Sequence, residues 1–144
     1  MEIRSLHANE REAALALIWE TFLRFEAPDY VPEGVRAFRA FIDAPEQIDA
    51  LEFFGAFQEG ELLGVLATSE RRKHICCFFV AAAHQRRGIG RKLWEHLLAN
   101  SKNNLFTVHS SPYAVPVYHK LGFVDTDAER MEDGIRYTPM KYTR

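Results

Sequence analysis

The sequence predicts one mixed α/β domain with the element order β-αα-βββ-α-β-α-ββ. Apolar residues recur at helical spacing in several segments, strand-like runs lie between them, and one run, 75–80, is apolar on both faces. A strand that is apolar on both faces is expected in the centre of a sheet that helices cover on both sides. The 144 residues, 47% of them hydrophobic, can bury one core, and no repeat or linker divides residues 1–144.

The first third of the chain is predicted to form a strand and two helices. Residues 2–6 have the pattern of a short strand. Asn9 followed by Glu12 resembles a helix N-cap with its reciprocal acid, and a helix is expected after it. Two prolines in the segment 26–32 prevent this helix from continuing, and the apolar positions in 35–42 predict a second, short helix.

The middle of the chain is predicted to contain three strands and a helix. Residues 52–58 and 62–69 have strand patterns and are joined by a Glu-Gly pair that favours a tight hairpin turn. The strand 75–80 follows after a charged turn, and a helix opens at 85–90. The apolar stripe of this helix comprises Leu93, Trp94, Leu97 and Leu98.

The last third is predicted to alternate again between strand and helix. Residues 105–109 read as a strand. Pro112 is suited to the start of the next helix, and Gly122 is suited to its end. Residues 135–142 are expected to form the last strand.

The charge and the cysteines indicate the class of protein. Eighteen Lys and Arg against twenty Asp and Glu give a net charge of −2, so neither a nucleic acid nor an anionic membrane is indicated as the main partner. The amino terminus lacks a signal-peptide pattern, and no apolar run could span a bilayer, so we expect a cytoplasmic protein. A zinc site could be built from His74, Cys76 and His84, but without a second ligand pair we expect buried thiols and no metal.

The segment 85–91 has the composition of a phosphate-binding site. Gly88 and Gly90 permit close backbone approach at a helix start, where unpaired N–H groups and the helix dipole favour an anion. Arg86, Arg87 and Arg91 add positive charge. The Lys-Ser/Thr pair of a triphosphate loop and the third glycine of a dinucleotide fold are both missing. A tight structural turn is the alternative for a bare glycine pair.

Two blocks of sequence resemble the motifs of the GCN5-related N-acetyltransferases. The first block is Phe78-Phe79-Val80 followed by Gln85-Arg86-Arg87-Gly88-Ile89-Gly90-Arg91-Lys92-Leu93, and the second is Ser111-Pro112-Tyr113-Ala114-Val115-Pro116-Val117-Tyr118-His119-Lys120-Leu121-Gly122-Phe123. The resemblance implies a mostly antiparallel sheet with a splay between its fourth and fifth strands. It also implies acetyl-CoA as the acyl donor.

Carried over residue by residue, the resemblance implies a donor site and a catalytic acid. The residues implied in donor binding are Phe78, Phe79, Val80, Gln85, Arg86, Arg87, Gly88, Ile89, Gly90, Arg91 and Ser111. Tyr118 is implied as the acid that protonates the leaving thiolate, and a phenol is acidic enough for this task. Its alternative role is that of a core aromatic. Ser111 departs from the family pattern, which has Asn in many members.

The general base and the acceptor site are less well marked in the sequence. His74 begins the central strand, near the position of a catalytic glutamate in the histone-modifying branch of the family, and its ordinary pKa suits a base. By resemblance, Phe25, Glu26, Asp29 and Tyr30 lie in the loop that lines the acceptor pocket. Glu26 and Asp29 are the next candidates for the base. The alternatives are a solvated loop and a water chain.

The sequence therefore predicts an N-acetyltransferase that moves an acetyl group from acetyl-CoA to a primary amine by direct attack in a ternary complex. The acceptor is a small molecule or a peptide, and a homodimer is left open. The alternative is a module that binds acyl-CoA as a sensor without turnover.

Overall fold

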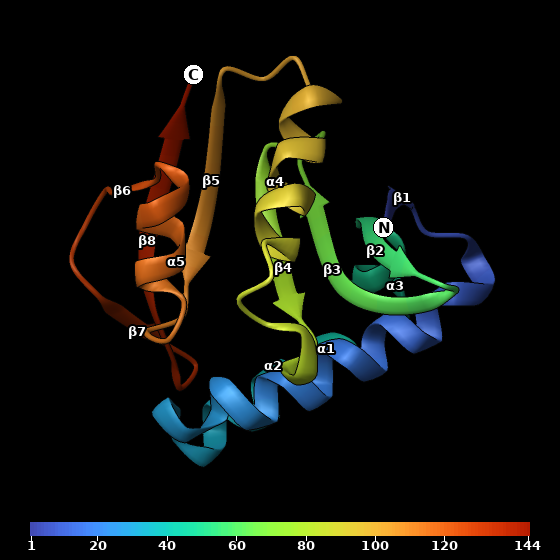
Figure 1. Ribbon diagram of the computed structural model, residues 1–144. Helices are drawn as coiled ribbons and strands as arrows, with labels where there is room; N and C mark the ends of the chain where they lie inside the picture. The colour runs from blue at the N-terminus through green and yellow to red at the C-terminus, as the bar shows by residue number, and fades with distance from the viewer.

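The computed structural model describes all residues 1–144 as a mixed sheet with helices on both faces (Figure 1). The strands are β1 (Glu2–Ser5), β2 (Glu52–Gln58), β3 (Glu61–Ser69), β4 (His74–Val80), β5 (Leu105–Ser110), β6 (Val124–Asp125), β7 (Arg130–Glu132) and β8 (Ile135–Thr143). The α-helices are α1 (Arg11–Phe25), α2 (Pro32–Ile42), α3 (Pro45–Asp49), α4 (Ile89–Ala99) and α5 (Val115–Leu121). Single 3₁₀ turns cover Ala8–Glu10, Ala27–Asp29 and Ala82–His84.

The strand order is β1-β2-β3-β4-β5-β8-β6, with β7 paired to β8. Only β4 and β5 are parallel neighbours; the other pairs are antiparallel. This arrangement confirms the predicted mixed, mostly antiparallel sheet and the central place of the strand that begins at residue 74. None of the helices is both long enough and apolar enough to cross a membrane.

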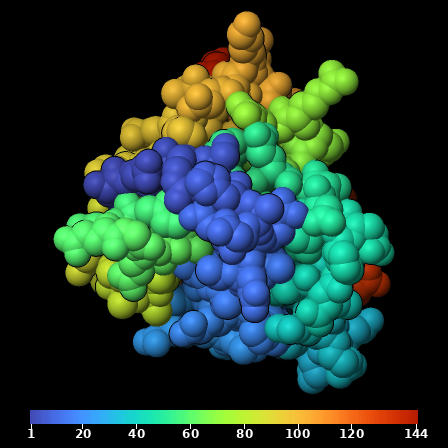
Figure 2. Space-filling model, turned by 90° about the vertical axis from the view of Figure 1, so that its right-hand side faces the viewer, coloured from blue at the N-terminus to red at the C-terminus, as the bar shows by residue number.

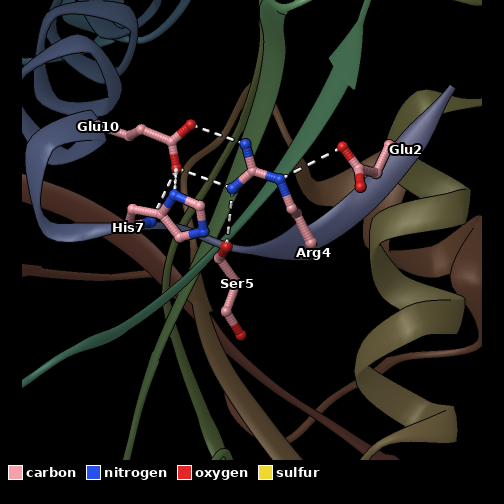
Figure 3. A network of polar contacts seen from close by, with 5 residues as sticks. All are labelled: Glu2, Arg4, Ser5, His7 and Glu10. Atoms are coloured by element: carbon pink, nitrogen blue, oxygen red, sulfur yellow. Dashed lines mark hydrogen bonds and ion pairs between the residues drawn. The ribbon is translucent and has the colours of Figure 1, made fainter.

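The start of α1 differs from the prediction. The Glu10 carboxylate accepts the backbone N–H of His7 at 2.7 Å, so the acid of the cap is Glu10 and the capped turn begins before Asn9. Arg4 of β1 donates two hydrogen bonds to the same carboxylate, at 2.8 and 2.7 Å (Figure 3). The prediction of an Asn9–Glu12 cap was wrong because the acid is held by a strand residue, which a local pattern does not reveal.

Two apolar layers cover the two faces of the sheet. On one face the predicted stripe of α4 is buried, with Leu93, Trp94 and Leu97 each at most 2% exposed. On the other face α1 buries Ile18 and Phe22, and α2 and α3 extend the same layer. Figure 2 shows residues of the first fifty packed together over the side that α1 occupies. Burial of each large apolar side chain contributes about 1.5–3 kcal/mol to folding.

A splay between β4 and β5 creates the site. The two strands pair only at His74–Thr107 and Ile75–Val108, and they separate beyond that point. Cys76 has no partner on β3, because the register shifts there, and such a bulge bends the strand. Because the pairing with β5 ends at Ile75, residues 76–80 of β4 have no strand beside them on the β5 side. The structure confirms the predicted splay between the fourth and fifth strands.

The turn between β7 and β8 packs against the first turn of α2. Gly34 and Gly134 are so close that a Cβ atom on either would collide with the backbone around the other. Arg136 of β8 donates a hydrogen bond to the carbonyl oxygen of Asp29 at 3.2 Å. These contacts join the segment after α1 to the far half of the sheet, beyond the splay.

Candidate active site

A cleft of about 470 Å³ lies where β4 and β5 diverge. Its walls are the second half of β4, the loop and first turn of α4, one face of α5 and the end of α1. The predicted site residues that line it are Phe25, Glu26, Phe78, Phe79, Val80, Gln85, Arg86, Gly88, Ile89, Gly90, Arg91 and Tyr118. The end of α1 and one face of α5 therefore line the same cleft, although they are far apart in the sequence.

The start of α4 has the geometry of an anion site. Gly88 precedes the helix with φ of 79°, and Arg86 adopts a left-handed φ of 64° in the same loop. A Cβ on Gly90 would lie 3.7 Å from the Phe78 ring, so the backbone here runs close to the cleft wall. Arg87 lies outside the lining and contacts His84 at 3.4 Å. The glycines, free N–H groups and cations suit a diphosphate, so these residues fit coenzyme A.

One residue that the sequence did not single out closes part of this cleft. The Tyr113 ring stacks on Phe25 with 5.0 Å between centroids, and its hydroxyl donates to Gln85 Oε1 at 3.2 Å. Gln85 Nε2 in turn donates to the carbonyl oxygen of Val80 at 2.9 Å. The signal for Tyr113 was present in the second motif block, but its role depends on three segments that only the fold brings together.

Tyr118 lies on the buried side of the cleft. Its residue is 5% exposed, and its ring packs edge-on against Phe78 and Phe123, at centroid distances of 5.9 and 5.3 Å. Burial raises the pKa of the phenol well above its usual 10, and the nearby Glu26 carboxylate raises it further. The hydroxyl therefore holds its proton at neutral pH.

Glu26 is the C-cap residue of α1, is half-buried and lines the cleft. Burial raises the pKa of this carboxyl to about 7; interaction with the Ser111 hydroxyl lowers it, and the Asp29 charge raises it. Ser111 itself is buried outside the cleft lining, and its Oγ accepts the backbone N–H of Ala114 at 3.3 Å. A carboxyl poised near neutrality in a cleft is suited to proton transfer.

The other predicted site residues lie elsewhere. His74 is at the opposite end of β4, roughly 13 Å along the strand from Phe78, and its Nδ1 lies 2.8 Å from Thr107 Oγ1. Burial and the neighbouring His109 lower the pKa of His74. The Tyr30 ring packs on the Phe22 ring with 5.5 Å between centroids, and neither Tyr30 nor Asp29 lines the cleft. The role of His74 as a base stays a prediction. No group of three or more His, Cys, Asp or Glu side chains is arranged to hold a metal ion.

The chain is similar to known proteins in both sequence and fold. A protein-family model described as an acetyltransferase (GNAT) domain matches residues 26–144. A GCN5-related N-acetyltransferase from Rhodopseudomonas palustris superposes with a TM-score of 0.83 at 20% identity, covering 99% of this chain and 95% of the other. The PaiA N-acetyltransferase of Thermoplasma acidophilum, solved in complex with coenzyme A, gives 0.78 at 18% identity, covering 99% and 98%.

A third solved structure, apo YjaB from Escherichia coli, gives a TM-score of 0.75 at 20% identity over 98% of this chain and 96% of the other. A search of curated protein sequences returned no match. The structural likenesses, at these identities, establish the fold. The family model covers most of the chain, including the whole cleft apart from Thr21 and Phe25. The chain therefore belongs to the acetyltransferase (GNAT) domain family.

Proposed function

We propose that this protein is an N-acetyltransferase that uses acetyl-CoA to acetylate a primary amine. The observation that carries the proposal is the cleft, where the unpaired edge of β4, the glycine loop of α4 and Tyr118 meet on one surface. The comparison structure with coenzyme A adds support at the level of the fold. Acyl transfer to an amine is the chemistry that this combination serves best.

The donor would be held by groups of this chain that have no partner in the fold. The free edge of β4 at 78–80 supplies backbone groups for the pantetheine arm, and the N–H groups of the α4 loop face the diphosphate. Arg86 and Arg91 line the same end of the cleft and supply positive charge. Gln85 now occupies the carbonyl of Val80, so the arm competes with this side chain.

Acetyl-CoA, when bound, supplies a thioester carbon as electrophile and a thiolate as leaving group. Tyr118 Oη is the proton donor for the departing sulfur, since it lines the cleft and stays protonated. Direct attack by the amine is supported by the state of the thiols: Cys77 is buried, and burial raises its pKa, so the thiolate that a covalent intermediate needs is disfavoured.

The proposal is tested by release of CoA thiol from acetyl-CoA in the presence of polyamines, amino acids, aminoglycosides and lysine-containing peptides. We expect turnover with at least one amine class, and initial-rate lines that intersect when donor and acceptor are varied. Parallel lines would instead indicate a covalent acyl-enzyme. A thermal shift with CoA, combined with no turnover on any amine, would favour the acyl-CoA sensor.

A further inference from the structure

We infer that Glu26, at the end of α1, takes the proton from the acceptor ammonium. This inference rests on the proposed acetyltransferase activity. It assigns the base to the end of α1 in place of the first residue of β4.

The position of Glu26 carries the first step of the argument. Glu26 lines the cleft that Tyr118 also lines, and its charge raises the pKa of the phenol. Phe25 and Phe79 line the same cleft and provide apolar surroundings. His74 has no place in this lining and bonds to Thr107 instead. An ammonium that reaches the surface occupied by Tyr118 therefore meets the Glu26 carboxylate.

Ser111 carries the second step. It is buried and does not line the cleft. Its Oγ accepts the N–H of Ala114, and the Ser111 hydroxyl lowers the pKa of the Glu26 carboxyl. Ser111→Ala is therefore a variant that changes the pKa of Glu26 without replacing a residue of the cleft lining.

The groups around Glu26 agree with a carboxyl that titrates near neutrality. Asp29, on the following turn, adds a negative charge that raises the pKa, whereas Ser111 lowers it. Tyr30 beside it, Tyr118 from α5 and Cys77 from β4 are neutral at pH 7, because the pKa of each is raised. The balance leaves the pKa of Glu26 at about 7.

The protons of the proposed reaction balance. Glu26 accepts one proton from the ammonium and frees the nitrogen lone pair. As the carbon–nitrogen bond forms and the carbon–sulfur bond breaks, Tyr118 gives its proton to the sulfur. The amine nitrogen loses a second proton, which restores the Tyr118 phenol. Glu26 then releases its proton to water, so each turnover liberates one proton overall.

The first arm of the test is the pH dependence of kcat/KM with an amine that the parent protein accepts. We expect the parent to gain activity on an acid limb with a midpoint near 7, and Glu26→Gln to lose about 100-fold in kcat. Ser111→Ala removes a group that lowers the Glu26 pKa, so its midpoint moves up. Asp29→Asn removes a group that raises it, so its midpoint moves down. Glu20→Gln, on the exposed side of the same helix, is the matched control.

The second arm needs no turnover. The pKa of Glu26 rises from 4.5 to about 7 on folding, so the stability that this shift gives is complete below pH 4.5 and is lost as pH rises through 7. Glu26→Gln cannot ionise. Its melting temperature relative to the parent should therefore increase between pH 4.5 and 7 and then stay level, while Glu20→Gln shows no such trend.

Three results would overturn the inference. One is an active Glu26→Gln variant with the acid limb of the parent. Another is a midpoint that moves in His74→Ala but not in Ser111→Ala or Asp29→Asn, which would make His74 the base. The third is a Ser111→Ala variant whose only change is weaker CoA binding, because its hydroxyl would then be a donor contact. A parent protein without turnover on any amine would instead remove the proposed function.

Discussion

At Tyr118, the packing of the ring can be tested separately from proton donation, because only the hydroxyl oxygen distinguishes tyrosine from phenylalanine. The ring packs against Phe78 and Phe123, and the residue lines the cleft. Phenylalanine keeps the ring contacts and removes only the proton donor. Replacing Tyr118 with phenylalanine is therefore the most direct test of the proposed acid.

Tyr118→Phe should lower kcat about 100-fold at saturating acetyl-CoA, equivalent to roughly 3 kcal/mol of transition-state stabilisation. The affinity for acetyl-CoA should stay within about threefold of the parent. The measurements are steady-state kinetics and a binding isotherm. Turnover equal to that of the parent would exclude Tyr118 from proton transfer, and weaker binding with unchanged kcat would make its hydroxyl a donor contact.

Gly88 allows a test of the anion site by charge alone. A side chain there meets no atom within 4 Å, and its φ of 79° is one that Asn and Asp tolerate better than other residues. We expect Gly88→Asp to weaken CoA binding at least tenfold more than Gly88→Asn, because only the carboxylate opposes the diphosphate. Isothermal titration of both variants measures this difference. Equal affinities would place the diphosphate elsewhere.

The sequence predicted some of these residues and missed others for a physical reason. The glycine loop and Tyr118 lie in contiguous motifs, so the resemblance to the family motifs marked them. The sequence ranked His74 before Glu26 as the candidate base, because it does not show which end of β4 opens into the cleft. Tyr113 was missed because its partners, Phe25 and Gln85, are distant in sequence.

At the scale of elements, the C-terminal end of α4 depends on two arginines. Arg144 donates to the carbonyl oxygens of Leu98 at 2.7 Å and of Asn103 at 2.8 Å, and Arg72 donates to that of Asn100. The carbonyls of Leu98 and Asn100 lie at the end of the helix, where they lack helical partners and carry the negative end of the dipole, whereas that of Asn103 lies in the following loop.

Arg144→Ala should therefore lower the free energy of unfolding by about 1 kcal/mol and the melting temperature by about 2–4 °C. Lys102→Ala removes an exposed cation near the same helix end without breaking a hydrogen bond, and it should change neither quantity measurably. Chemical denaturation of the two variants gives the comparison. Equal stabilities would mean that the arginine contributes only its charge.

The elements that the sequence predicted well are those with a buried periodic face. Strand β2 has its predicted bounds, and the bounds of β3, β4 and β8 differ by one residue. Helix α3 was not predicted, because five residues are too few to show a helical period. Strands β6 and β7 were not assigned bounds because they are short and exposed, so no alternation of apolar residues marks them.

At the scale of the whole molecule, two register pairs are the only ladder that joins strands β1–β4 to the rest of the sheet. Most of the element order could be read from the sequence, except for α3 and one of the three strands after α5. The splay came from the family resemblance, since no residue pattern shows where a ladder ends. A donor lying in the splay would contact both halves and act as a further connection between them.

CoA should accordingly slow amide hydrogen exchange in residues 76–80 of β4 and in the first turn of α4, because it gives partners to N–H groups that now have none in the sheet. Strand β2, which is paired on both sides, serves as the internal reference. Exchange measured by mass spectrometry with and without CoA makes the comparison. Protection confined to any other surface would contradict the proposed donor site.

The contact between Gly34 and Gly134 has a consequence for how this sequence can diverge. Each position excludes even a methyl group, and Gly134 also has a left-handed φ of 79°. In a saturation library selected for folded protein, both positions should return glycine almost alone. Gly60, whose added Cβ would meet nothing, should admit Asn and Asp. Two glycines a hundred residues apart would then be inherited as a pair.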